Sequence, residues 1–150
     1  MSDTSEIDLN DGAPTYAAAA DTAGAYADYF PPWLEHLGEE VTIEGSLLDG
    51  AARGPDAVRS IIGAIRTLYE RQDFNFAGPY RDGDWIEDYN ARVDGRPIAC
   101  VAVITRDESG AAIRVAANYR PRSSLLVLSG LVGERLAGTP YARYFLTGSS

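Results

Sequence analysis

The sequence of 150 residues contains one cysteine, one histidine and no lysine. A single cysteine excludes an intramolecular disulfide, and one cysteine with one histidine excludes a zinc site built from Cys and His ligands. Cys100 lies in the most apolar stretch of the chain, which favours a small buried side chain over a reactive thiolate. We therefore expect no metal site of this kind.

Long apolar runs and an excess of positive charge are also missing. No apolar run approaches the ~20 residues that span a bilayer, so we expect no membrane partner. Residues 1–13 carry four acidic residues and no basic one, unlike a signal peptide, which predicts a disordered acidic tail and a cytoplasmic protein. The formal net charge is -9, and because an acidic chain repels phosphate, nucleic acid is not an expected partner.

What remains is the composition of one globular domain. Hydrophobic residues make up 45% of the chain, and its length suffices to bury about two-thirds of the unfolded surface. We expect a single domain over residues 14–146.

Four stretches carry helix signals. The alanine-rich stretch Tyr16–Phe30 predicts a helix that Pro31 and Pro32 must end, followed by a short helix over Trp33–Leu37. Arg53–Asp56 opens a third helix, whose apolar residues recur at spacings of three and four until about Arg71. A final helix over residues 123–137 is apolar nearly all round, so we expect it to be buried against the sheet or another subunit.

The strands are predicted over Val41–Gly45, Phe74–Tyr80, the hairpin Asp84–Ile104 and Ala112–Arg120. The hairpin turns at Asp94-Gly95, because Asp-Gly supplies the positive φ angles of a type I′ turn. Helices that precede a run of strands predict an α+β fold, with helices on one concave face of a bent antiparallel sheet.

The two arms of the hairpin differ in polarity. Side chains alternate along a strand, so Trp85, Glu87 and Tyr89 share one face with Ala91 and Val93. The second arm is apolar on both faces, as in a strand covered on both sides. This pattern indicates a sheet wrapped around a pocket.

Five short motifs stand in a familiar order: HLGEEVTIEG, a loop, ARGPDAVRSIIGAI, a hairpin bent at Asp-Gly-Arg-Pro, and DESGAAIRVAANYRP. Over about Tyr16 to Pro121 the chain resembles the SnoaL-like branch of the nuclear transport factor two-like superfamily. The resemblance implies a cone-shaped domain with a deep apolar cavity, an apolar small-molecule ligand and a homodimer joined through sheet surfaces. Members include ketosteroid isomerase, polyketide cyclases, limonene epoxide hydrolase and non-catalytic binding modules, so the fold implies a reaction only weakly.

The acids of ketosteroid isomerase have no counterpart in this chain. Its general base follows a Val-Glu-like pair after the first strand, and the matching position here is Gly45. Its second acid would fall at Ala102 or Ile104, and neither side chain can donate a hydrogen bond. The arginine between two aspartates of the epoxide hydrolases has no convincing match either.

Glu87 is the leading candidate for proton transfer. A carboxyl group in an apolar pocket has a raised pKa and can act as acid or base near neutral pH. Arg120 is expected to pair with Glu87 or to bind an acidic or enolate substrate, and Tyr89 or Tyr26 to donate a hydrogen bond to a substrate carbonyl. The alternative is that Glu87 faces solvent or makes a structural ion pair.

The other candidates are one histidine and a group of cavity residues. His36 would carry any step that needs imidazole, at the mouth of the cone, or else is a solvated residue at a helix end. Substrate contacts are expected from Tyr26, Phe30, Trp33, Trp85, Asn118, Ala102 and Ile104, although aromatic residues at such positions also serve as core.

Three functions stay open. The first is a cyclase or isomerase without metal or organic cofactor, acting on an apolar oxygenated molecule of polyketide or terpenoid type. The second is a non-catalytic binding or dimerisation module of the same fold, and the third is an epoxide hydrolase.

Overall fold

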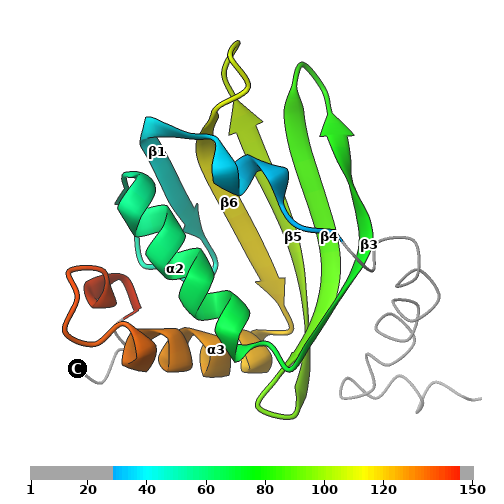
Figure 1. Ribbon diagram of the computed structural model, residues 1–150. Coiled ribbons are helices and arrows are strands. Elements are labelled where there is room, and N and C mark those ends of the chain that lie inside the picture. The colour runs from blue at the N-terminus through cyan, green and yellow to red at the C-terminus, as the bar shows by residue number, and fades with distance from the viewer. Residues whose placement is uncertain (1–28, 146–150) are drawn as a thin grey trace, which may run out of the picture.

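A six-stranded sheet in the order β2-β1-β6-β5-β4-β3 carries the fold (Figure 1). The computed structural model of the protein describes residues 29–145, so the expected acidic tail, most of the helix Tyr16–Phe30 and the candidate Tyr26 lie outside the described residues. The strands are β1 (Leu37–Gly45), β2 (Ala52–Arg53), β3 (Arg71–Tyr80), β4 (Asp84–Val93), β5 (Arg96–Arg106) and β6 (Ala112–Arg120). The helices are α2 (Pro55–Leu68) and α3 (Arg122–Arg135), with the 3-10 turns η4 (Pro32–Glu35) and η5 (Ala142–Phe145).

The α+β class is confirmed, but the sheet is mixed rather than wholly antiparallel. Strands β3 to β6 pair antiparallel in chain order, as expected. Strand β1 instead pairs parallel with β6, at the side of β6 away from β5, and antiparallel with the two-residue β2. Strands β3, β4 and β5 lie between β1 and β6 in the sequence, and the sequence pattern gives no sign that β1 and β6 pair.

The central hairpin has the predicted turn. Asp94 and Gly95 have φ angles of 50° and 74°, and Val93 pairs with Arg96 across the turn. Both central residues therefore have the positive φ of a type I′ turn. The register that follows pairs Glu87 with Ala102, which fixes the faces of both strands.

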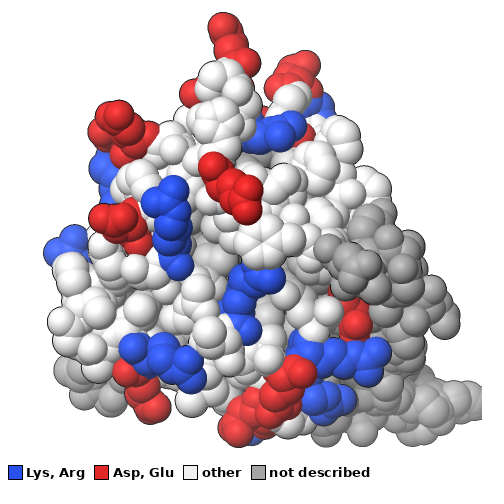
Figure 2. All heavy atoms as spheres, in the orientation of Figure 1, with Lys and Arg blue, Asp and Glu red and all other residues white. Residues whose placement is uncertain are grey.

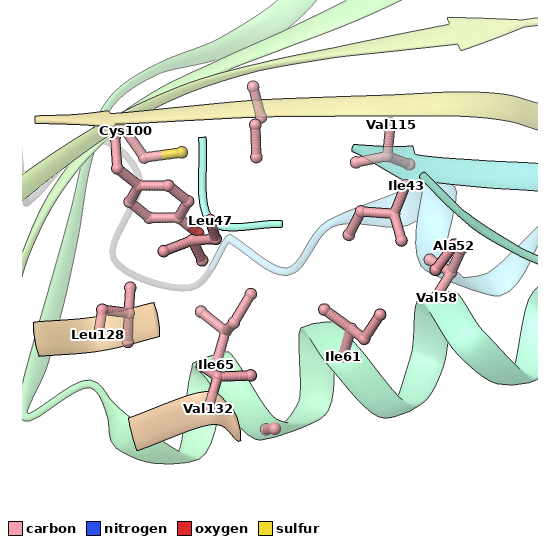
Figure 3. Close-up of a cluster of buried hydrophobic side chains, with 14 of the residues drawn as sticks. Ile43, Leu47, Ala52, Val58, Ile61, Ile65, Cys100, Val115, Leu128 and Val132 are labelled. Atoms are coloured by element: carbon pink, nitrogen blue, oxygen red, sulfur yellow. The ribbon is translucent and has the colours of Figure 1, made fainter. Parts of the chain in front are cut away.

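Helix α2 and the turn η4 lie over one face of the sheet, and α3 runs along one end of it (Figure 1). Pro55 occupies the first turn of α2, where its missing N–H costs nothing. The buried side chains of α2 keep the predicted spacing, and Val58, Ile61 and Ile65 point toward Ile43 and Val115 of the sheet (Figure 3).

The final helix α3 packs in part against the sheet, through β5 and β6, which is one of the two placements expected for it. Ser124, Leu128 and Val132 form its buried stripe, four residues apart, whereas Leu126 is 61% exposed. Helix α3 contacts η5 and α2 as well as β5 and β6. None of the helices within residues 29–145 has the length and apolarity to cross a membrane.

Gly45 ends β1 with a φ of +137°, a backbone conformation that residues with a side chain rarely adopt. A Cβ atom at this position would lie 1.9 Å from the backbone oxygen of Ala117, its partner on β6. The close approach of β1 to β6 therefore requires glycine at the position where the isomerases named above have their base.

Candidate functional site

A small cavity lies between η4, α2 and the inner face of the sheet. Its volume is about 30 Å³, room for about one water molecule. The lining comes from six elements or their ends and is mainly apolar: Pro31, Trp33, Ile62, Ile65, Arg66, Gln72, Glu87, Tyr89, Ala102, Val115, Ala117 and Tyr119. The expected apolar cavity is thus in place, but it is far smaller than the deep cavity that the resemblance implied, and three aromatic side chains, Trp33, Tyr89 and Tyr119, take part in its lining.

Glu87 is the one carboxyl group that residues 29–145 contribute to this lining, and it is 3% exposed. The hydroxyl of Tyr29 donates to its Oε2 over 2.5 Å, and the indole Nε1–H of Trp33 donates to the same oxygen over 2.9 Å. Both donors come from the segment that covers the cavity. Among residues 29–145 no hydrogen bond ends on Oε1, which leaves that oxygen available to a ligand.

Burial raises the pKa of Glu87 above its ordinary value of 4.5. The hydrogen bonds from Tyr29 and Trp33, and the positive charge of Arg66, act in the opposite direction without cancelling the effect of burial. A carboxyl group of this kind titrates closer to neutral pH, where it can both accept and donate a proton.

Three tyrosine hydroxyls meet beside Glu87. The hydroxyl oxygen of Tyr69 lies 2.6 Å from that of Tyr89 and 3.0 Å from that of Tyr119, and the last two are 3.1 Å apart. Tyr69 follows α2, whereas Tyr89 and Tyr119 come from β4 and β6. Burial raises the pKa of Tyr89 and of Tyr119 well above 10, so these hydroxyls stay protonated and remain hydrogen-bond donors.

Cys100 lies against this hydroxyl cluster and is fully buried. Burial raises the pKa of its thiol to about 12. The thiol is therefore protonated at neutral pH, as expected for a structural side chain rather than a nucleophile.

Several predicted site residues meet at the cavity. Glu87, Tyr89, Trp33 and Ala102 all line it. Trp85 does not line the cavity, but its Nε1–H donates to the hydroxyl of Tyr29 over 2.8 Å, so that Trp85, Tyr29 and Glu87 form a chain of hydrogen bonds. Ile104 is fully buried opposite Trp85 and does not line the cavity.

Asn118 and Arg120 were expected at the cavity, and this expectation is wrong. Both are exposed on the outer face of β6, because Val115, Ala117 and Tyr119 occupy the inner face. Arg120 therefore cannot pair with Glu87.

His36 and Phe30 also lie outside the cavity lining. His36 is exposed after η4, where its carbonyl oxygen accepts a hydrogen bond from the N–H of Ala112 over 2.8 Å. Phe30 is 50% exposed, with the Arg66 guanidinium 4.6 Å from its ring centre.

Four residues at the site were missed. Tyr119 could have been found from the sequence, because Val115, Ala117 and Tyr119 are the apolar set in the alternation of β6. Tyr29, Arg66 and Tyr69 reach the site through tertiary packing of η4 and α2, for which the sequence carries no local signal.

No protein-family model matches the chain, and no curated protein matches it by sequence. Solved structures do match. A protein with a cystatin-like fold from Silicibacter pomeroyi DSS-3 is 17% identical, with 84% of each chain covered and a TM-score of 0.65. A steroid delta-isomerase from Pseudomonas aeruginosa is 22% identical over 81% of this chain and 93% of its own, with a TM-score of 0.66.

An NTF2-like protein of unknown function from Mesorhizobium loti is 17% identical over 71% of this chain and 93% of its own, with a TM-score of 0.52. These likenesses show the fold, which is the NTF2-like fold that the sequence resemblance implied. They leave the reaction to be argued from the site.

Proposed function

We propose that the protein is an isomerase or cyclase that needs no metal or organic cofactor and moves a proton on an apolar, oxygenated small molecule. The observation that carries the proposal is that a buried carboxyl group with a raised pKa and a cluster of protonated hydroxyls line one apolar cavity. Polyketide and terpenoid intermediates have the required combination of apolar skeleton and carbonyl groups.

In this proposal ionised Glu87 removes a proton from a carbon next to a substrate carbonyl. The C–H electron pair forms a C=C bond, and the carbonyl π electrons move to oxygen. Tyr89 or Tyr119 donates a hydrogen bond to that oxygen, which stabilises the negative charge as it develops. Glu87 then returns the proton to another carbon and is regenerated. In a cyclase the enolate carbon would instead attack a second carbonyl of the same molecule to form a C–C bond, and Glu87 would return the proton to the alkoxide oxygen left by that attack.

The positions of the two groups on β4 suit this reaction. Glu87 and Tyr89 are two residues apart and therefore about 7 Å apart along one face of the strand. Both side chains line the cavity, in which Ala102 and Ala117 contribute little bulk.

A substrate can enter only when Tyr29 and Trp33 move, because a cavity of about 30 Å³ has no room for one. Both residues belong to one short segment around η4, and both donate to the same carboxylate oxygen. Displacing this segment exposes Glu87 and enlarges the cavity in one step.

The test is proton transfer by the full chain in D₂O, measured by NMR on a panel of β,γ-unsaturated cyclic ketones. Glu87→Gln is expected to lower the rate by about 10²–10⁴-fold, the usual contribution of a positioned acid or base. Glu44→Gln is the matched control, because Glu44 is paired with Arg114 away from the cavity. Activity that survives in Glu87→Gln would show that the assignment is wrong.

A non-catalytic module is the second candidate, and one observation favours it. Tyr29 and Trp33 already donate hydrogen bonds to Oε2 of Glu87, as expected for a purely structural carboxyl group. A wild-type protein without proton transfer on any ketone of the panel would support this function. The epoxide hydrolase gains no support, since the lining contains no aspartate.

A homodimer formed through the outer face of the sheet remains a prediction. Sedimentation equilibrium of the full chain tests it directly, and a monomer at all concentrations would contradict it.

A further inference from the structure

A second hollow lies between η4 and α2, on the outer side of the cavity. This groove has a volume of about 320 Å³, near the lower end of the range for small-molecule sites. Phe30, Leu34 and Ile62 give it apolar walls, and Arg59, Arg66 and Glu35 give it charge. Among the described residues the groove is open to solvent.

The groove holds two arginines that form no ion pair within residues 29–145, although the charge of Arg66 also acts on Glu87. Arg59 and Arg66 are seven residues apart on α2, which places them two turns apart on one face. The ion pairs found within residues 29–145 engage Arg53, Arg71 and Arg114 instead. Figure 2 shows basic side chains over α2 with uncharged surface between them.

Arg66 also connects the groove to the cavity. Arg66 and Ile62 line both spaces, and the guanidinium of Arg66 packs against the ring of Phe30 at 4.6 Å. A ligand held at Arg66 is therefore next to the cavity that contains Glu87, and close to the segment around η4 that has to move.

We propose that the groove binds the carboxylate of an amphipathic monocarboxylic acid, with Arg66 as its main cation and Arg59 as the second. The apolar part of the acid lies against Phe30, Leu34 and Ile62. This inference rests on the proposed function in one respect: it makes such an acid the substrate class of the enzyme, held by its carboxylate while its apolar part reaches toward Glu87.

Charge supports this choice of ligand. The whole chain has a net charge of -9 and repels anions at long range, so any preference for an acid must come from the groove itself. A guanidinium fits a carboxylate with two parallel N–H donors, and no ion pair within residues 29–145 competes for Arg59 or Arg66. Glu35 on the opposite wall works against an anion, which provides a variant expected to bind more tightly.

The experiment compares 4-phenylbutyrate with its neutral amide, by calorimetry on the full chain at low ionic strength. The acid is expected to bind about tenfold more tightly than the amide. Arg66→Met should abolish this preference, Arg59→Met should reduce it by about twofold to threefold, and Glu35→Gln should increase it by a similar factor. Arg114→Met is the control, since Arg114 is paired with Glu44 outside the groove.

Equal binding of acid and amide, no binding of either, or full acid preference in Arg66→Met would each overturn the inference. Binding of 4-phenylbutyrate is measured without turnover, so this inference is tested separately from the proposed function. If acid binding fails while proton transfer depends on Glu87, the groove assignment alone is wrong. If acid binding succeeds and proton transfer does not depend on Glu87, the function alone is wrong.

Discussion

Replacing Glu87 with glutamine should change how stability depends on pH. Glutamine has nearly the same shape, and its side-chain oxygen can still accept the hydrogen bonds that Tyr29 and Trp33 donate to Oε2. The substitution therefore removes the titration of a buried acid and little else.

The direction follows from the raised pKa of Glu87. The folded protein holds this proton more tightly than the unfolded chain, so the stabilisation is complete below the ordinary pKa of 4.5. This stabilisation is lost as the pH rises from 4.5 through the higher pKa of the folded state. Above that pKa the contribution of Glu87 to stability no longer changes with pH. Over that interval the wild type should lose stability relative to Glu87→Gln by at most about 1.4 kcal/mol per pH unit, the limit for one proton.

The assay is urea unfolding of both proteins between pH 5 and pH 9, followed by the fluorescence of Trp33 and Trp85. The difference in unfolding free energy, wild type minus variant, should fall with pH and then level off at the folded-state pKa of Glu87. Glu44→Gln, at an ion-paired surface position, should show no such fall. A difference that is independent of pH, or one that rises with pH, would refute the reasoning.

Three further predictions concern the packing. Gly45→Ala should lower the unfolding free energy by about 2 kcal/mol or more, because the added Cβ would meet the backbone oxygen of Ala117. Gly130→Ala on α3 is its control: the added Cβ meets no atom within 4 Å, so this variant should raise the unfolding free energy by up to about 1 kcal/mol. Ile61→Ala should cost about 2–5 kcal/mol in urea unfolding, since Ile61 is fully buried between α2 and the sheet. Cys100, with a pKa of about 12, should react with a thiol reagent at pH 8 only as fast as the protein opens.

The hairpin could be predicted from the sequence because every signal in it is local. Asp94-Gly95 set the turn, the turn set the register, and alternation then placed Glu87 on the inner face. Alternation alone does not say which face of the sheet is covered. The second arm of the hairpin, which is apolar on both faces, indicated that the face carrying Glu87 is covered.

The pairing of β1 with β6 could not be predicted in the same way. It joins segments about 70 residues apart, and no turn between them sets a register. The prediction of which arginine lies near Glu87 was wrong for a related reason. Arg120 was chosen from a neighbouring strand, but the nearby cation is Arg66, which the packing of α2 across the sheet brings to the cavity.

The segment that closes the cavity separates the two candidate functions. An enzyme with a cavity of about 30 Å³ must open to bind a substrate, whereas a module whose core includes Tyr29 and Trp33 has no reason to open locally. The indole N–H of Trp33 reports this opening, because it is buried and bonded to Glu87.

Native-state hydrogen exchange measures the free energy of that opening. For an enzyme we expect the Trp33 indole proton to exchange through a local opening, with a smaller free energy and little dependence on urea. The amide proton of Cys100, in the middle of the sheet, is the internal standard for global unfolding. If the two protons exchange with the same free energy and the same urea dependence, the segment opens only when the whole protein unfolds, and the proposed enzyme has no route to its substrate.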